Sequence, residues 1–569
     1  MSYVCKLKWK MEKVKKTNRT RAQESTNAIE KLYISMRHLF SRGFYKPMGV
    51  SGETLRKSLL SLRPEIYGSI AEERIELNGL AYVIERLPKG IEECQFINLT
   101  ADEGYDDSHF ETIIPPKRRR NCYRIDKDQM NIEITRGRSE IYDILTHLTF
   151  LFIESHKILK RVTLNEGTDF IREWKYLEDI VVYNKKITDQ EREVAVAHLS
   201  NILGRTFDEV LSIHKTFQSE ENKDRFFHLI YWLGKLAINE VLDNKKRKIT
   251  FSTVLIEEIG HHIYGDVWAD NIKKILKENK LLQRPIHIIS ANMHSVLNSI
   301  YAKGALPKEA EEFEGFELFQ LLSNADSKPL QKTVKEYASE NGLIYVKDTS
   351  GTNINVQIID TDKINFEVSS FNKENSINKS PVIIVMDYAF GEQAYETMDE
   401  LLKPYKNSKK KNHLDVKSVS IMGKAGILEG GKGDIMIPTS HIFEGTADNY
   451  PFKNELSKED LEGFGVQVFD GSMISVLGTS LQNKDLLEFF HDSTWNVIGL
   501  EMEGAHYQKA IQSASKIRGN ISKNVKVRYA YYASDNPLET GATLASGGLG
   551  MTGVTPTYAI TQKILEQIL

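Results

Sequence analysis

The spacing of apolar residues changes near residue 280, and this change constrains the fold more than any other feature of the sequence. Upstream, apolar side chains recur at helical spacing in Thr20–Phe40, and Ile141–Lys160 is strongly apolar without a helix breaker. Downstream, short apolar runs typical of strands alternate with segments of helical spacing. We therefore predict two domains: a mostly α-helical one of unknown role over residues 1–279, and an α/β one over residues 280–569.

The predicted strands of the second domain are short apolar runs bounded by turn-forming residues. Three of them predict a meander, over residues 342–346, 354–359 and 364–368. The other predicted strands are Ile286–Ser290, Pro381–Met386, Val416–Met422 and Val525–Ala533. A predicted helix, Glu392–Leu402, lies between two of these runs, and this alternation favours a layered α/β architecture.

The composition excludes several classes of protein. The chain has 569 residues, of which 41% are hydrophobic and 27% charged, values typical of a soluble globular protein with two or more domains. The net charge of -3 gives the chain no overall positive charge with which to bind a polyanion, so we expect no nucleic-acid partner. No segment approaches the roughly 20 apolar residues of a membrane span, so we expect no membrane partner. The basic N-terminal segment lacks the apolar region of a secretory signal.

The three cysteines, Cys5, Cys94 and Cys122, are odd in number and unclustered. This pattern favours a reducing compartment over a disulfide framework, so we expect a cytoplasmic location. Glu258 and His261 have the spacing of a helix-bundle metal motif, but the sequence offers no second copy to pair with them. We therefore expect no metal and no cofactor.

Two carboxylates flank a methionine where an apolar run meets a predicted helix, in the order Glu501, Met502, Glu503. A carboxylate can accept two hydrogen bonds from vicinal hydroxyls, such as those of a ribose. Methionine offers a soft apolar surface on which a sugar ring can rest. The alternative is an acidic helix N-terminus, which the helix macrodipole favours.

A second polar group follows the last predicted strand, which ends in Ser534 and Asp535. Ligands of open α/β sheets bind beyond the carboxyl ends of strands. An aspartate whose pKa is raised by burial can act there as a general acid. The alternative is a turn that only terminates the strand.

Two glycines, Gly423 and Gly426, directly follow the predicted strand Val416–Met422. Glycine lets the backbone approach a ligand closely, and free backbone N–H groups there can bind an anion. The spacing does not match a P-loop, so we do not expect a nucleoside triphosphate site of that kind.

In this order, these motifs resemble the nucleoside phosphorylase and nucleosidase superfamily, which includes purine nucleoside phosphorylases, methylthioadenosine/adenosylhomocysteine nucleosidases and AMP nucleosidase. The resemblance covers about residues 285–569, and Leu477–Leu481, which contains Thr479, corresponds to a turn that contacts base and ribose. It implies a three-layer α/β/α domain, a small-molecule nucleoside or nucleotide as ligand, and a homo-oligomer.

The resemblance also implies a role for each motif. Glu503 would accept hydrogen bonds from the ribose hydroxyls, and Met502 would pack on the sugar. Asp535 would protonate or hydrogen-bond N7 of a purine leaving group, and Ser534 would orient it. The remaining residues implied in ribose or base binding are Glu501, Thr479, Gly423 and Gly426.

The sequence departs from the superfamily where the attacking group is handled. The arginines that hold phosphate in phosphorylases are absent, and Ser295 and His294 stand where nucleosidases place a water-positioning glutamate. Lys424 could replace part of the anion site. We therefore expect a purine nucleosidase-like hydrolase of nucleotide metabolism. The alternatives are a non-catalytic nucleoside-binding sensor and a phosphorylase with a rebuilt phosphate site.

Overall fold

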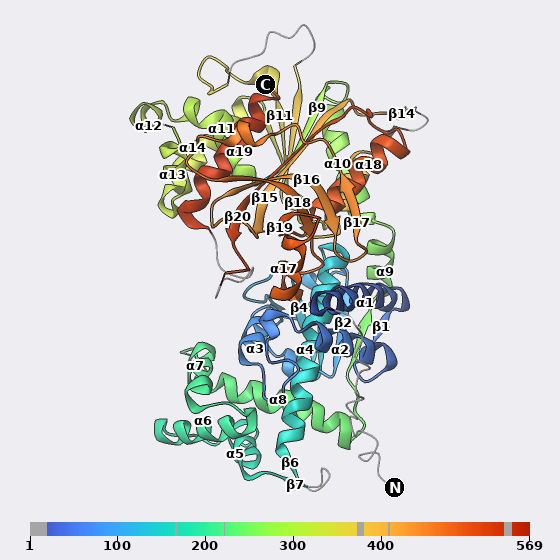
Figure 1. Ribbon diagram of the computed structural model, residues 1–569, viewed down its shortest axis with the longest axis vertical. Coiled ribbons are helices and arrows are strands. Elements are labelled where there is room, and N and C mark those ends of the chain that lie inside the picture. The colour runs from blue at the N-terminus through green and yellow to red at the C-terminus, as the bar shows by residue number, and fades with distance from the viewer. Residues whose placement is uncertain are drawn as a thin grey trace. The chain divides into compact units, whose positions relative to one another are not determined.

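The computed structural model describes residues 20–164, 169–220, 222–313, 315–371, 380–407, 410–539 and 549–569 (Figure 1). The chain forms two compact units. The first unit contains the described part of Met1–Ile134, with Glu140–Glu257 and Ser480–Leu486. The second contains Thr135–Ser139, Glu258–Thr479 and Leu487–Leu569, with the same restriction. Each unit therefore includes a short segment from a distant part of the sequence.

Helices make up much of the first unit, as the apolar spacing predicts. The first of them begins after a Thr20–Gln23 capping box and ends at Gly43, whose φ is 77°. The helices are α1 (Arg21–Arg42), α2 (Val50–Leu62), α3 (Leu77–Ile84), α4 (Gly137–Val162, in this unit from Glu140), α5 (Arg172–Val181), α6 (Asp189–Leu203), α7 (Phe207–Phe217), α8 (Arg225–Leu242) and α9 (Thr253–Gly260, in this unit to Glu257).

The first unit also contains a six-stranded sheet, which the prediction of a mostly α-helical domain missed. Its order is β1 (Phe44–Tyr45), β8 (Lys248–Phe251), β2 (Phe96–Thr100), β5 (Gln129–Glu133), β4 (Cys122–Asp126) and β3 (Thr112–Ile113). A separate hairpin joins β6 (Thr163–Leu164) to β7 (Asp169–Phe170). Strands of two to five residues that carry polar side chains give little period-two signal, which explains the error.

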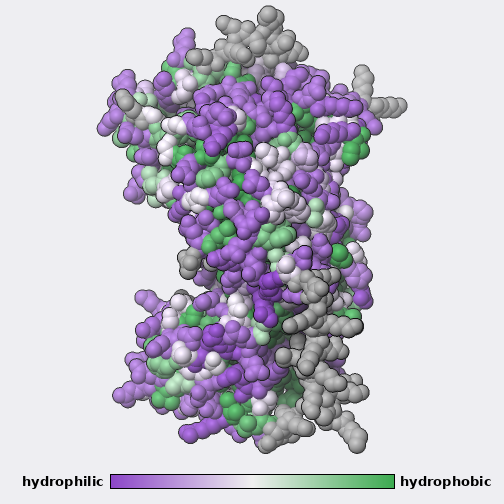
Figure 2. Space-filling view, viewed as in Figure 1, coloured by the Kyte–Doolittle hydropathy of each residue, from purple (hydrophilic) through white to green (hydrophobic). Residues whose placement is uncertain are grey.

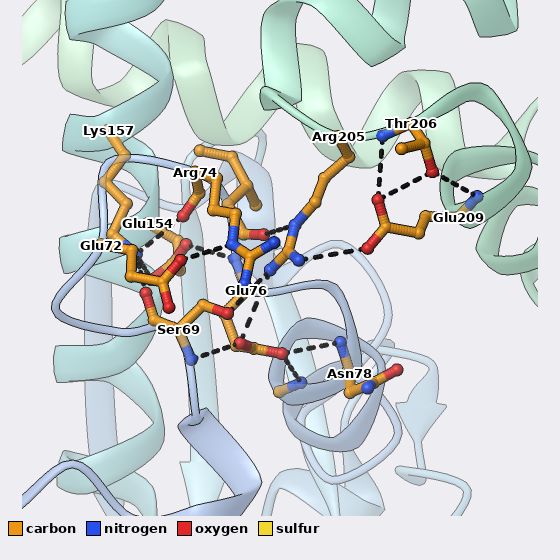
Figure 3. Close-up of polar contacts among 12 residues, drawn as sticks. Ser69, Glu72, Arg74, Glu76, Asn78, Glu154, Lys157, Arg205, Thr206 and Glu209 are labelled. Carbon is orange, nitrogen blue, oxygen red and sulfur yellow. Dashed lines mark hydrogen bonds and ion pairs between the residues drawn. The ribbon is translucent and has the colours of Figure 1, made fainter.

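A network of charged side chains ties the segment before α3 to α4 and α7 (Figure 3). The guanidinium of Arg205 donates to the carbonyl of Ile75 at 2.7 Å and to Ser69 Oγ at 3.0 Å. On α4, Glu154 Oε2 accepts the N–H of Glu76 at 2.9 Å, and Glu154 Oε1 lies 2.7 Å from Lys157 Nζ. Burial raises the pKa of Glu154 to about 7.

The second unit is built on a ten-stranded sheet. Its main path runs through β10 (Leu343–Val346), β11 (Val356–Asp360), β12 (Val382–Met386), β9 (Ile286–Ser290), β15 (Val416–Ile427), β19 (Val497–Glu501), β18 (Val468–Ser475), β16 (Ile435–Phe443) and β17 (Asp448–Pro451). The last strand, β20 (Lys526–Asp535), pairs with both β15 and β16. Consequently β15, β19, β18, β16 and β20 close into a ring.

Helices cover both faces of this sheet, which is a three-layer arrangement (Figure 1). On β12, Ile384 packs in one core with α10 (Ile263–Glu278), α15 (Gln393–Leu401) and α18 (Gly504–Gln512), whereas Ile383 packs in the other. The second core contains α11 (Met293–Ala305), α13 (Glu317–Ser323), α14 (Lys328–Glu340) and α19 (Val554–Glu566). Shorter elements are α12 (Pro307–Glu312), α16 (Lys458–Leu461), α17 (Lys484–Asp492) and the β13–β14 hairpin (Tyr405–Asn407, Lys410–Asn412).

Three details of the second unit differ from the predictions. Residues 364–368 form turns and bends instead of a third meander strand. Gly423 and Gly426 lie within β15, which continues to Ile427 because both residues pair with β20. The helix α10 packs in the core of the second unit, although it precedes residue 280.

Hydrophilic residues predominate on the face shown in Figure 2, and hydrophobic ones lie between them in small separate groups. Among the described residues, no helix has the length and apolar character that a membrane span needs. Cys94 and Cys122 are free and buried, and burial raises the pKa of each thiol to about 12. Cys5 lies outside the described residues.

Candidate functional site

Several of the predicted site residues, among them Gly426 and Asp535, lie near one edge of the second unit's sheet. The strands β12, β9, β15 and β20 are mutually parallel neighbours in that order, so their carboxyl ends share an edge. Near that edge, Gly426 of β15 pairs with Asp535 of β20 on one side and with Leu500 of β19 on the other. Because adjacent strands lie about 4.8 Å apart, the backbones of Asp535 and Leu500 are about 10 Å apart.

Asp535 is a buried carboxyl that can carry a proton. Its side chain is only 7% exposed, and Oδ2 is buried without a hydrogen-bond partner among the described residues. Burial raises its pKa, against the opposing effects of Ser534 and of the positive charge on Lys424. The hydroxyl of Ser534 contacts Asp535 Oδ1 and lies 3.1 Å from the carbonyl oxygen of Ala425. The contact with Ser534 restrains the orientation of the carboxyl.

Glu503 lies at the N-cap position of α18 and is half-buried. Its Oε1 accepts the backbone N–H of Gly391 at 2.9 Å. Burial, and secondarily the negative charge of Glu501, raises the pKa of Glu503 to about 8. A Cβ added at Gly391 would lie 3.9 Å from Cε of Met502, so the Gly391 turn borders both Met502 and Glu503.

Glu501 has a different role from the ligand contact that the resemblance implies. Its Oε2 accepts the N–H groups of Glu503 and Gly504, and its Oε1 accepts the hydroxyl of Ser475. The side chain is 1% exposed, and His441 Nδ1 lies 3.5 Å from Oε1. Glu501 therefore acts as a buried cap of α18, because it accepts backbone N–H groups at the start of that helix. The two glutamates diverge because β19 ends at Glu501 and the backbone does not stay extended through Glu503.

The glycine segment is not crowded by the surrounding protein at Gly423. A Cβ added at Gly423 would make only ordinary contacts, 3.6 Å from Tyr388 Cε1 and 3.9 Å from Tyr531 Cδ1. A larger side chain would therefore fit among the protein atoms at position 423, and packing does not explain why a glycine is present. Lys424 is exposed, and its charge acts on Asp535, so it is a cation beside the buried carboxyl.

Of the two residues proposed to handle water or an anion, Ser295 is engaged inside the fold. It is fully buried, its N–H donates to Asn292 Oδ1 at 2.7 Å, and its Oγ accepts from Thr561 Oγ1 at 2.9 Å. His294 lies in the first turn of α11, after β9, and its side chain reaches solvent. Partial burial and the charge of Lys335 lower its pKa, which favours the neutral imidazole.

Thr479 is half-buried and is the last residue of the second unit before Ser480–Leu486. It follows β18 by four residues, and the last residue of that strand, Ser475, contacts Glu501. The sequence analysis did not single out Gly391 as a site residue, although Glu392–Leu402 was predicted as a helix. Among the described residues, no group of three His, Cys, Asp or Glu side chains has the arrangement of a metal site.

The chain belongs to the family of unknown function DUF6909, whose family model matches residues 53–312 and 302–569. No curated protein matches the sequence. Among solved structures, it is similar to the Campylobacter jejuni methylthioadenosine/S-adenosylhomocysteine nucleosidase, with 11% identity and a TM-score of 0.29. It is also similar to the Helicobacter pylori futalosine hydrolase, with 13% identity and a TM-score of 0.29. Each comparison covers 50% of this chain and 99% of the other.

A third similar structure is isoform 2 of the Schistosoma mansoni uridine phosphorylase. It has 12% identity and a TM-score of 0.30, over 54% of this chain and 90% of that one.

Proposed function

We propose that the second unit is a purine nucleosidase-like hydrolase that cleaves the N-glycosidic bond of a nucleoside or nucleotide. One observation carries this proposal: Gly426 of β15 pairs on one side with Asp535, a buried, protonatable carboxyl. On the other side it pairs with β19, the strand that leads into Met502 and Glu503. An acid and a sugar-binding segment thus flank the same strand end.

The chemistry of glycosidic cleavage needs both parts. As the bond breaks, electron density collects on the base and positive charge on the ribose. Asp535 would donate its proton to N7 of the purine, which turns the base into a better leaving group. Glu503 would bind the ribose hydroxyls, and its carboxylate form would stabilise the positive charge on the sugar. Met502 would support the ring between them.

A non-catalytic nucleoside-binding role is the second candidate, and the position of Ser295 favours it. Its hydroxyl is buried against Thr561, so it does not hold an attacking water at the sheet edge. In the hydrolase, neutral His294 would take the proton of that water. Should phosphate replace water, Lys424 would be the cation beside it, and the enzyme would be a phosphorylase.

An assay in which purified full-length protein is incubated with nucleosides and the free base is measured distinguishes these functions. The panel is adenosine, inosine, AMP, methylthioadenosine and adenosylhomocysteine, each with and without phosphate, with the base quantified by chromatography. Release without phosphate supports the hydrolase, and release that requires phosphate supports the phosphorylase. Absence of release together with a ligand-induced rise in Tm supports the binding module. If no compound is cleaved and none raises the Tm, nucleoside recognition is refuted.

A further inference from the structure

A short segment from the N-terminal half of the sequence belongs to the second unit: Thr135–Ser139, called the strap below. It contacts residues 390–393, the turn that follows β12 and leads into α15, and this segment is called the Gly391 turn below. The same turn donates the N–H of Gly391 to Glu503. The strap therefore contacts the turn that is hydrogen-bonded to Glu503, the residue predicted to bind the ribose.

Two consecutive backbone amides of the turn have different partners. The N–H of Gly391 donates to Glu503 Oε1 at 2.9 Å, and the N–H of Glu392 donates to Ser139 Oγ at 2.8 Å. The two N–H groups belong to adjacent peptide planes that meet at the Cα of Gly391, so the orientation of the second plane sets the ψ of Gly391 and limits the path of the turn that carries the first. Loss of the Ser139 acceptor would leave the amide of Glu392 without its partner. That peptide plane would then be held by the bond from the N–H of Ala394 to the carbonyl of Gly391 at 3.0 Å, so the turn would open more easily.

Charge and packing hold the strap against the turn. Arg138 Nη1 lies 3.0 Å from Glu392 Oε1, and both side chains are mostly buried. The side-chain amide of Gln393 donates from Nε2 to the carbonyl of Thr135 at 3.3 Å. An ion pair with this little exposure is screened less by salt than a surface pair.

The fit between strap and turn leaves no space for a side chain at Gly391. A Cβ at this position would lie 2.3 Å from Ser139 Oγ and 2.6 Å from Ser139 Cβ. The φ of Gly391 is 55°, in the left-handed region that favours glycine. The turn conformation and the strap thus depend on each other.

We propose that Ser139 and Arg138 are positioning residues for Glu503: they hold the Gly391 turn so that its amide fixes one carboxyl oxygen and leaves the other to the ribose. This inference rests on the proposed function only for the identity of the ligand. The structural link from Ser139 through Gly391 to Glu503 stands on the contacts alone.

Two measurements on full-length Ser139→Ala test the proposal. Hydrogen exchange resolved to single amides should show faster exchange at Gly391 and Glu392, by roughly 10-fold, because local opening becomes easier. For the panel nucleoside with the fastest turnover, KM should rise roughly 5- to 10-fold, the value of one lost hydrogen bond, while kcat changes less. The variant Arg138→Met should act in the same direction.

The matched control is Ser339→Ala, at an exposed position of α14, where the hydroxyl of Ser339 donates to the carbonyl of Lys335 at 2.9 Å. It should change neither readout. Unchanged exchange at Gly391 in both strap variants would overturn the proposal, whatever the activity. Faster exchange with an unchanged KM would overturn the link to ligand binding. If wild-type protein neither cleaves nor binds the panel compounds, the proposed function fails, and the exchange result still decides whether the strap positions the turn.

Discussion

The backbone N–H of Gly391 donates to Oε1 of Glu503 at 2.9 Å, although 112 residues separate them in the sequence. This bond joins the turn after β12 to the start of α18, the helix that follows β19. It occupies one carboxyl oxygen of Glu503 with a fixed donor. The protonation state of the other oxygen then determines how the residue meets a ligand.

We expect nucleoside affinity to increase as the pH rises through about 8. Burial raises the pKa of Glu503 to about 8, so the group is mostly neutral at pH 7 and becomes a carboxylate above pH 8. A carboxylate forms stronger, charge-assisted hydrogen bonds with ribose hydroxyls. Calorimetric Kd values for adenosine between pH 6.5 and 9 test this. In Glu503→Gln the increase in affinity with pH should vanish. If this variant has the same pH profile as wild type, the titrating group is not Glu503.

Asp535→Asn should remove turnover far more than binding. The amide cannot deliver a proton to the base, so kcat should fall by about 10²- to 10⁴-fold, the usual contribution of a general acid. The Kd for the same nucleoside should change only a few-fold, because the side chain keeps its size. Asp470→Asn on β18, an exposed carboxyl, is the matched control and should retain full activity. An unchanged kcat in Asp535→Asn would remove Asp535 from the mechanism.

Glu501→Ala should act on stability. The carboxylate accepts two backbone N–H groups at the start of α18 and the hydroxyl of Ser475, and its removal leaves buried donors unpaired. The expected loss is about 2–4 kcal/mol of unfolding free energy, seen as a lower urea midpoint. A variant with the wild-type midpoint and weakened nucleoside binding would contradict the assignment of Glu501 as a helix cap.

The order of motifs in the second unit could be predicted because each depends on local sequence. Apolar runs marked β9, β12 and β20, and Ser534 and Asp535 are the last two residues of β20. The divergence of Glu501 and Glu503 was not predictable, because it depends on where β19 ends and α18 begins. The contact between the strap and the Gly391 turn could not be predicted from local sequence either, because Ser139 and Glu392 are 253 residues apart in the chain. The sheet of the first unit was missed because its strands are short and partly polar.

The stability of the first unit should depend on Glu154 in a defined pH window. Burial raises the pKa of Glu154 from the model-peptide value of 4.5 to about 7, so between these values the folded state binds more protons than the unfolded state. The stabilisation is therefore complete below about pH 4.5 and is lost as the pH rises to about 7. The expected change is about 3 kcal/mol, at 1.36 kcal/mol per pKa unit.

Urea unfolding of wild-type protein and Glu154→Gln at pH 5 and pH 8 isolates this contribution. The variant cannot ionise at position 154, so its stability should decrease less between the two pH values than that of wild type. Glu72→Gln is the control, because that carboxylate belongs to the same network but is about half exposed beside Arg74. Equal pH dependence in wild type and Glu154→Gln would mean that Glu154 is already ionised at pH 5, held so by the ammonium of Lys157 at 2.7 Å.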